Sequence, residues 1–275
     1  MAIVVNNNIA SLAAQLNLAR NTDQLQRSVE HLSSGLRITR AADDAAGLGI
    51  AATLNSQIVS INQATRNAND GISLTQVADG AANTIGNLLS RMRELASQSA
   101  SGVLGNTQRS YVDQEFTALR SEIDRIANVT KFNGQALLSG STLSFSIQVG
   151  YQSSSNDTLS LTLAALDTNT LGLSSVNVST SANAQSALGN LDSAISAVAA
   201  ARATYGATQN RFSATIDSLQ VTSQNFTAAV SRIQDADVAY ETSQFTKNQV
   251  LVQSGIAVLA QANALPQQAL ALLRG

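Results

Sequence analysis

The sequence contains no cysteine and no tryptophan, and it has a single proline among 275 residues. The missing cysteines exclude disulfides and thiolate metal sites. With one proline, the commonest helix breaker is almost absent. Aromatic residues make up only 4% of the chain, so the core must be built from thin side chains. The composition therefore predicts long helices that pack close together.

Charged residues are also scarce, at 12% of the chain, against roughly 25% in an average domain. The net charge of −2 provides no basic field that would recruit nucleic acid. Residues 1–19 and 248–273 carry no charged side chain at all. These two charge-free ends raise the question of what covers them.

Neither end has the pattern of a membrane or secretory segment. The N-terminal apolar run stops at Val5 with no basic residues before it, unlike a signal peptide. Gln253, Gln261 and Pro266 interrupt the last segment, which stays well short of ~20 apolar residues. We expect no membrane insertion, and a protein of this kind that leaves the cell needs a route without cleavage.

Apolar residues recur at spacings of three and four along three segments, which predicts three helices. The first begins near Asn8 and is interrupted at residues 33–35. The second runs from about Asp43 to Gln98, and the third follows a loop at residues 102–106. Gly71 lies in a turn signal inside the second helix, but the periodicity resumes after it. We therefore expect the helix to tolerate this glycine.

The middle of the chain is rich in serine, threonine and glycine. TLSFSIQVG and TLSLTL within it alternate apolar and polar residues, which predicts two short strands at about residues 139–165. A repeat of seven residues then begins, carried by Leu191, Val198, Tyr205, Phe212, Leu219, Phe226, Ile233 and Tyr240. Such a repeat predicts coiled-coil packing, and Asp235 and Asp237 are expected to break or cap it. The predicted fold is mainly α, a long antiparallel helical coiled-coil hairpin or bundle with a small β-hairpin insert.

The two charge-free ends become neighbours if the helices fold back as a hairpin. A pair of helices buries one stripe on each partner, whereas both ends are apolar over broad faces. The remaining surface must meet other copies of the chain, and a head-to-tail contact that does not close into a ring forms an open helical filament. We expect both ends to be disordered in the monomer and to fold on assembly.

Several stretches resemble known sequences. The chain resembles the N-terminal region of bacterial flagellins in NNNIASLAAQLNL, LSSGLRI, DDAAGLGI and NANDGISLTQVADGA, and their C-terminal region in QNRF, SRIQDADVA and AQANALPQQALALL. The likeness spans about residues 1–150 and 183–275. Large flagellins carry outer domains in the middle, and the short segment between the two regions here implies that these domains are missing.

The resemblance implies a structural subunit of the extracellular flagellar filament, exported unfolded and assembled at the tip through its terminal helices. It implies paired terminal helices (the D0 layer, residues 1–42 and 235–275) and a helical bundle with the β segment (the D1 layer, residues 43–234). The expected partners are other copies of the chain, an export chaperone, the filament cap and the hook-junction proteins. The terminal residues expected to mediate assembly are Ile9, Leu12, Leu16, Val252, Ile256, Leu259 and Leu270.

One segment resembles the part of flagellins that an animal Toll-like receptor reads. The segment is LLSRMRELASQ, with a further position in DQEF, and the matching residues are Arg91, Leu95, Gln98 and Glu115. The alternative interpretation is that these residues belong to a subunit interface. Both roles are kept as hypotheses, with the interface favoured.

Patterns that suggest chemistry have simpler explanations. GLGIAA, residues 47–52, fits a dinucleotide fingerprint but follows no strand, so a packing role for its glycines is expected. His31 is the only histidine and cannot form a triad without a matched acid and nucleophile. We expect no enzyme activity, no cofactor and no metal. A hook–filament junction protein and a signalling coiled coil remain alternatives to the filament subunit.

Overall fold

The computed structural model describes the backbone of residues 7–274 and the side chains of residues 7–264. The chain divides into two compact units. The first combines residues 1–56 with 224–275, and the second consists of residues 57–223. The predicted mainly helical fold with small antiparallel sheets is confirmed.

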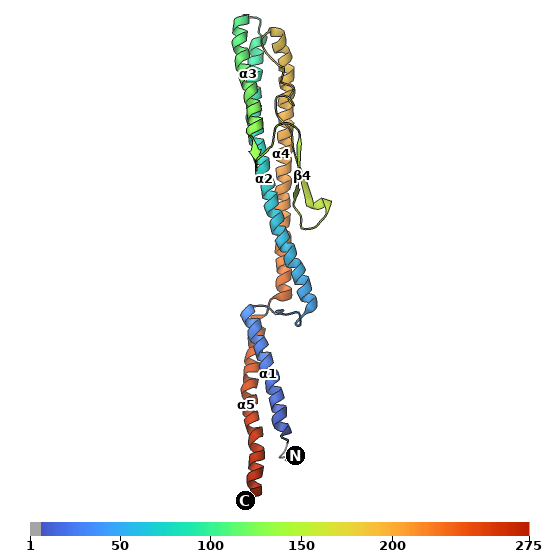
Figure 1. Cartoon of the computed structure of the whole chain (residues 1–275), viewed down its shortest axis with the longest axis vertical. Helices are drawn as coiled ribbons and strands as arrows, with labels where there is room; N and C mark the ends of the chain where they lie inside the picture. The colour runs from blue at the N-terminus through green and yellow to red at the C-terminus, as the bar shows by residue number, and fades with distance from the viewer. Residues whose placement is uncertain (1–6, 275) are drawn as a thin grey trace. The chain divides into compact units, whose positions relative to one another are not determined.

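The first unit is built on two antiparallel helices, α1 (Ile9–Ser34) and α5 (Val238–Arg274), which lie side by side (Figure 1). The Asn8 side chain accepts a hydrogen bond from the backbone N–H of Ser11 at 3.0 Å and so caps the start of α1. Helix α1 ends at Gly35, whose φ of 71° suits glycine. The helix predicted from about Asn8 to residues 33–35 is therefore confirmed.

A short antiparallel bridge closes this unit at the other end of α1. Leu36 pairs with Asp235, and the Arg37 N–H donates to the Gln234 carbonyl at 2.6 Å. The Arg37 guanidinium adds a hydrogen bond to the Ile233 carbonyl at 2.7 Å. The chain leaving α1 is thus fixed against the chain entering α5 through backbone groups.

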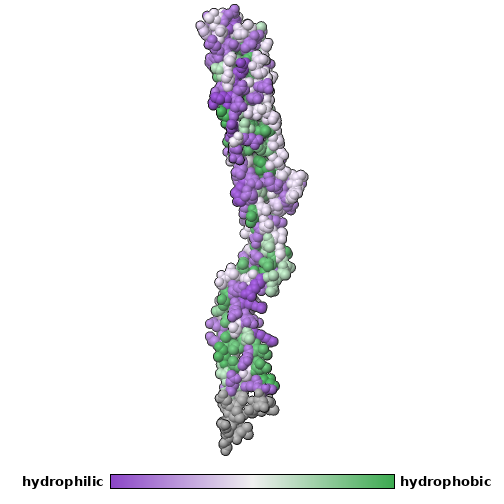
Figure 2. Space-filling view, viewed as in Figure 1, coloured by the Kyte–Doolittle hydropathy of each residue, from purple (hydrophilic) through white to green (hydrophobic). Residues whose placement is uncertain are grey.

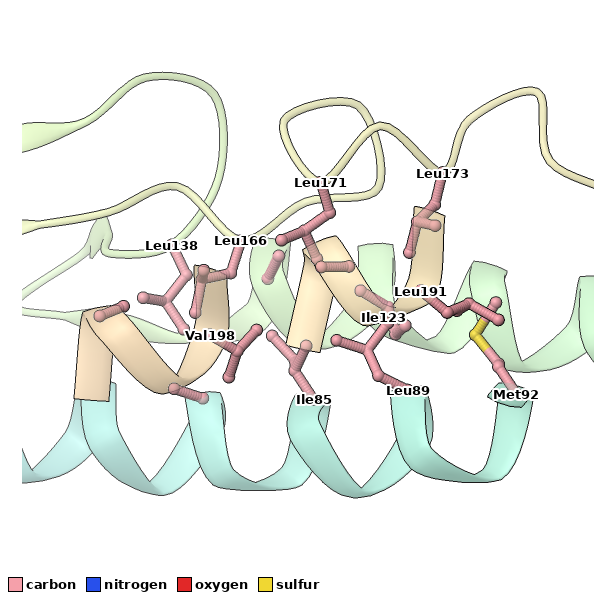
Figure 3. Packing of buried hydrophobic residues seen from close by; sticks show 14 of the residues in the cluster. Ile85, Leu89, Met92, Ile123, Leu138, Leu166, Leu171, Leu173, Leu191 and Val198 are labelled. Carbon is pink, nitrogen blue, oxygen red and sulfur yellow. The ribbon is translucent and has the colours of Figure 1, made fainter. Parts of the chain in front are cut away.

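The second unit is built mainly from three helices, α2 (Ala45–Ala100), α3 (Asn106–Val129) and α4 (Ser181–Gln234). Residues 45–56 of α2 and residues 224–234 of α4 belong to the first unit. Its core is a continuous apolar cluster (Figure 3). The labelled members come from α2, α3, α4 and the segment 137–178, and they are Ile85, Leu89, Met92, Ile123, Leu138, Leu166, Leu171, Leu173, Leu191 and Val198.

Two strands lie on this bundle, β3 (Leu143–Gln148) and β4 (Thr158–Leu163), paired antiparallel from Leu143↔Leu163 to Gln148↔Thr158. The two predicted strands are confirmed, and the buried leucines of β4 alternate with exposed residues as expected. The pair β1 (Lys131–Phe132) and β2 (Gln135–Ala136) was not predicted. Its turn is Asn133–Gly134, with φ of 49° and 83°, and Asn-Gly is a common hairpin sequence.

The chain between β4 and α4 forms a strap, residues 166–178, that is held by polar side chains of α3. Asp124 accepts hydrogen bonds from the Thr168 N–H and hydroxyl at 2.9 and 2.8 Å. Arg120 donates to the Val176 carbonyl at 2.9 Å, and Asp113 accepts from the Val178 N–H at 2.7 Å. These side chains satisfy backbone groups that no strand or helix pairs.

The seven-residue repeat is fully buried along only part of its length. Its members from Leu191 to Leu219 are buried in α4, as coiled-coil packing predicts. The next two members, Phe226 and Ile233, are half-buried, and the last, Tyr240, is 62% exposed. Helix α4 ends at Gln234, and the Asp237 carboxylate caps α5 by accepting from the Ala239 N–H at 2.9 Å, so the predicted break is confirmed.

Gly71 sits inside α2, which continues through it as predicted. A methyl group at this position would lie 2.7 Å from the Phe212 ring and 2.8 Å from the Ile147 Cδ1 atom. Phe212 is fully buried with Ala68, Val149 and Leu159, so its ring has little room to move. Gly71 is therefore required for the close approach of α2, α4 and β3.

Gly71→Ala is expected to destabilise the second unit relative to Gly80→Ala. Gly80 lies in the same helix, and a methyl group there would meet nothing within 4 Å. Both changes gain the helix preference of alanine, whereas only Gly71→Ala carries an overpacking cost of about 1–3 kcal/mol. Urea unfolding of the two variants measures the difference, and equal midpoints would contradict the packing role.

Candidate assembly surface

The contact between α1 and α5 combines fully buried small and polar residues with half-buried apolar side chains, which are Leu18, Leu25 and Leu32 on α1 and Phe245, Val252 and Leu259 on α5. The described buried residues of these two helices are Ser11 and Ser28 on α1, and Asn248 and Ala262 on α5. Gly255 allows close approach, because a methyl group there would lie 3.3 Å from the Leu18 Cδ1 atom. His31 Nδ1 lies 3.4 Å from Glu241 Oε1 near the junction end. We call this contact the seam.

A second set of large apolar side chains on the same two helices lies outside the seam. On α1, Ile9, Leu12 and Leu16 are 71%, 58% and 55% exposed. Their spacing of three and four places them on one face of the helix. On α5 the exposed apolar residues include Val250, Leu251, Ile256 and Val258. Figure 2 shows hydrophobic surface over this unit.

Exposed apolar residues on several sides of α5 are unusual for a helix that packs against one partner. Leu251 and Val258 are seven apart and share one side, whereas Ile256 and Val250 lie elsewhere around the helix. A helix that is apolar all round is normally buried. The hairpin therefore presents a surface that needs further partners, as the charge-free ends suggested.

The seven residues expected to mediate assembly divide into three groups. Ile9, Leu12, Leu16 and Ile256 are exposed. Val252 and Leu259 are half-buried. Leu270 lies outside the part of the chain whose side chains are described. The structure adds Val250, Leu251 and Val258, which the sequence signalled only through the absence of charge from residue 248 onward.

The turn between α1 and α2 is organised by two adjacent carboxylates. The Asp43 carboxylate accepts hydrogen bonds from the N–H groups of Thr39 and Arg40 at 3.1 and 3.0 Å. The Asp44 carboxylate accepts from the Gly47 N–H at 2.9 Å, so it caps α2 as predicted. These hydrogen bonds lower the pKa of Asp43. The bond from the Arg40 N–H has the largest effect, and the bond from the Thr39 N–H comes next.

The positions related to receptor recognition lie on α2 and α3 in the second unit. Arg91 pairs with Glu115 at 2.9 Å and with Glu94 at 2.9 Å. The hydrogen bond to Glu94, and then that to Glu115, raises the pKa of the Arg91 guanidinium. Gln98 is exposed, whereas Leu95 is only 2% exposed and packs in the core. The structure thus brings Arg91 and Glu115 together on the surface and places Leu95 beneath it.

The residues that suggested chemistry have structural surroundings. Gly47 is buried, and a methyl group there would lie 2.9 Å from the Ile38 side chain, which confirms a packing role. Gly49 is exposed with nothing within 4 Å, so the packing role predicted for it is wrong. In the described part of the chain, acidic and histidine side chains do not gather into a group that could hold a metal ion. None of the helices described here has the length and apolarity that crossing a membrane requires.

Comparison with known proteins decides the family. Residues 5–142 match the bacterial flagellin N-terminal helical region, and residues 188–273 match the bacterial flagellin C-terminal helical region. A flagellin of Halalkalibacterium halodurans is 42% identical over 272 residues, covering 99% of this chain and 100% of that protein. The chain belongs to the bacterial flagellin family. It is therefore a structural subunit of the extracellular flagellar filament, and flagellins are not enzymes.

Other similar proteins agree with this assignment and with the short form of the chain. The flagellar filament 33 kDa core protein of Treponema phagedenis is 40% identical over 286 residues, covering 99% of this chain and 100% of that protein. A solved structure of a putative flagellar hook-associated protein from Vibrio parahaemolyticus matches 70% of this chain and 100% of its own, with a TM-score of 0.58 and 15% identity. That likeness shows a shared fold alone. The flagellin relatives fit the prediction that outer domains are missing.

The Asp43 carboxylate is expected to titrate below its ordinary pKa of 3.8. Because the folded pKa is lowered, the contribution of Asp43 to stability is fully present above pH 3.8 and is lost as the pH falls through the lower folded value. The amide shifts of Thr39 and Arg40 in an NMR titration report this step. Asp43→Asn should abolish it, and a midpoint at or above 3.8 would contradict the hydrogen-bond assignment.

Proposed function

We propose that the α1·α5 hairpin is the part of this filament subunit that joins copies of the chain. The observation that supports this most directly is that large apolar residues of both helices, such as Leu12, Leu16 and Ile256, remain exposed outside the seam. Burying a leucine or valine side chain is worth about 1.5–3 kcal/mol. The hairpin leaves this free energy available for contacts with other copies.

The proposal assigns residues 1–42 and 235–275 to the D0 layer and residues 43–234 to the D1 layer. Ile9, Leu12, Leu16, Val252, Ile256, Leu259 and Leu270 are the proposed assembly residues. The chain is exported unfolded, with an export chaperone, and adds at the tip beneath the filament cap. A seam that buries little apolar surface supports this route, because ordering a residue costs ~1–2 kcal/mol and the hairpin gains little until neighbours cover it.

The surface around Arg91, Gln98 and Glu115 is proposed as part of the subunit interface of the D1 layer. The exposed ion pair between Arg91 and Glu115 links α2 to α3 there. Recognition by an animal Toll-like receptor stays a hypothesis for this surface. The burial of Leu95 restricts such recognition to the polar residues around it.

The two alternative functions receive less support. A hook–filament junction protein shares the fold, as the hook-associated structure shows at 15% identity. The relatives that align along their whole length at 42% and 40% identity are named as a flagellin and a filament core protein. A signalling coiled coil would not account for the match to both flagellin regions.

The double variant Leu12→Gln, Leu16→Gln is expected to abolish polymerisation while leaving the stability of the monomer within about 0.5 kcal/mol. Both side chains are exposed in the monomer, so their loss removes contacts only between copies. The matched control is Leu12→Met, Leu16→Met, which keeps volume and apolarity. Sedimentation of seeded filaments and thermal unfolding provide the two measurements. Normal filaments from the glutamine variant would contradict the proposal.

Amide hydrogen exchange should separate the two states of the hairpin. In the dilute monomer, α1 and residues 238–264 are expected to exchange rapidly, because the seam alone does not offset the entropy of ordering. The core of α2 and α4 around Leu89 and Leu191 should remain protected. In filaments both terminal segments should become protected. Slow exchange of the ends in the monomer would show that the hairpin is stable without neighbours.

A further inference from the structure

A group of polar contacts joins the start of α1 to α5. The Asn8 side-chain NH₂ donates to the Ala262 carbonyl at 2.8 Å, while the oxygen of the same amide caps α1. The Ser11 hydroxyl donates to the Asn263 side-chain oxygen at 2.7 Å, and Ser11 is buried. The cap of one helix is therefore also bonded to the other. We call Asn8, Ser11 and Asn263 the clasp.

The rest of the seam does not by itself select one register. Its half-buried apolar residues recur every seven positions, at Leu18, Leu25 and Leu32 on α1 and at Phe245, Val252 and Leu259 on α5. The positions Asn248, Gly255 and Ala262 on α5 recur at the same spacing. Sliding α5 by seven residues, about 10.5 Å, would therefore again place one of these positions against Leu18 and apolar residues beside it. In helix pairs of this kind, a single buried polar contact can set the register.

We propose that the clasp sets the register of the α1·α5 hairpin, and that Asn8, Ser11 and Asn263 are positioning residues for filament assembly. The first part stands on the geometry of the hairpin, and the second rests on the proposed function. A slip of seven residues would move Ile9, Leu12 and Leu16 along α5 relative to Ile256. The surface offered to the next copy would then be different.

His31 and Glu241 form a second polar contact at the opposite end of the seam. This pair involves one long side chain and a separation of 3.4 Å between its nearest nitrogen and oxygen. The clasp has shorter contacts and uses a backbone carbonyl, which cannot move without moving α5. The proposal therefore gives the clasp the larger effect on register, and the test compares the two.

The absence of cysteine from the chain makes register directly measurable. A Cβ atom at position 255 would lie 3.8 Å from the Leu18 Cβ atom, a separation that disulfides adopt. The double substitution Leu18→Cys, Gly255→Cys therefore reports the observed register. Leu18→Cys with Ala262→Cys, and Leu18→Cys with Asn248→Cys, report slips of seven residues in either direction. Equilibration with glutathione gives the effective concentration of each pair.

The experiment adds Ser11→Ala, Asn263→Ala to each cysteine background, in the dilute chain and in seeded filaments. Links within one chain migrate as monomers on non-reducing gels, and links between copies migrate as dimers. The observed-register pair should dominate in the unsubstituted background, both in filaments and among the dilute molecules whose hairpin has formed, because a link forms only while the two helices are in contact. The clasp variant should reduce its advantage over the slipped pairs by about tenfold, and its filaments should seed poorly.

Two matched variants complete the test. Gln15→Ala, Gln253→Ala removes two exposed amides from the same helices and should change nothing. Glu241→Gln tests the opposite contact and should have the smaller effect. The proposal is overturned if the clasp variant leaves the ratio of links unchanged, or if Glu241→Gln alone shifts it. Failure of the proposed function would look different, because the unsubstituted chain would then form no filaments while the ratio could still be read in the dilute chain.

Discussion

The seam between α1 and α5 is the contact on which the behaviour of the terminal unit depends. Among the described residues it fully buries only serine, asparagine and alanine side chains, and it half-buries Leu18, Val252 and Leu259, while Leu12, Leu16 and Ile256 lie outside it. In an ordinary globular protein, the apolar residues of a helix gather in the stripe that faces its partner. Here apolar residues also cover the outer faces, in keeping with the proposal that other copies of the chain complete the core. The scarcity of charge at both ends follows from the same constraint, since a charge buried between copies would be costly.

The second unit follows the opposite rule within the same chain. Ile85, Leu89 and Leu191 meet in a closed apolar cluster (Figure 3), and its exposed ion pairs, such as Arg93 with Asp192 and Arg202 with Asp79, lie at its surface. Isolated exposed pairs contribute little to stability, so this unit depends on its core. The chain thus combines a bundle with a closed apolar core and a hairpin whose exposed apolar surface is proposed to be covered by other copies.

Much of the fold could be predicted from the sequence because helical periodicity is a local signal. The starts at Asn8, Asp44 and Asp237 were readable because short polar side chains cap helices, and the alternation in TLSLTL indicated a strand. The exposure of Tyr240 was not predictable, because a seven-residue spacing identifies residues on a shared face but does not show how far along the helix that face is covered. The small strands around Asn133–Gly134 are too short to show a period. Their turn sequence was the available sign.

The assembly surface was predictable in outline but not in detail. Absence of charge identified the two ends, while only the structure shows that Leu12 faces outward and Ser11 inward. The contact between Ser11 and Asn263 joins residues 252 positions apart, and no local pattern encodes such a pair. Leu95 is the converse case, since its motif suggests a surface role and its place in the helical repeat makes it part of the core.

The strap at residues 166–178 is held to α3 chiefly through its own peptide groups. Arg120 and Asp113 bind the backbone at Val176 and Val178, and the side chains that turn inward, such as Leu173, need only be apolar. Ser174 and Ser175 are exposed, and Ser174 binds Arg120 through its backbone carbonyl. Their side chains are therefore not needed to hold the segment. The outward positions of this stretch can therefore accumulate substitutions over evolutionary time with little harm to the bundle beneath it. Related proteins should differ early in the surface that this stretch exposes.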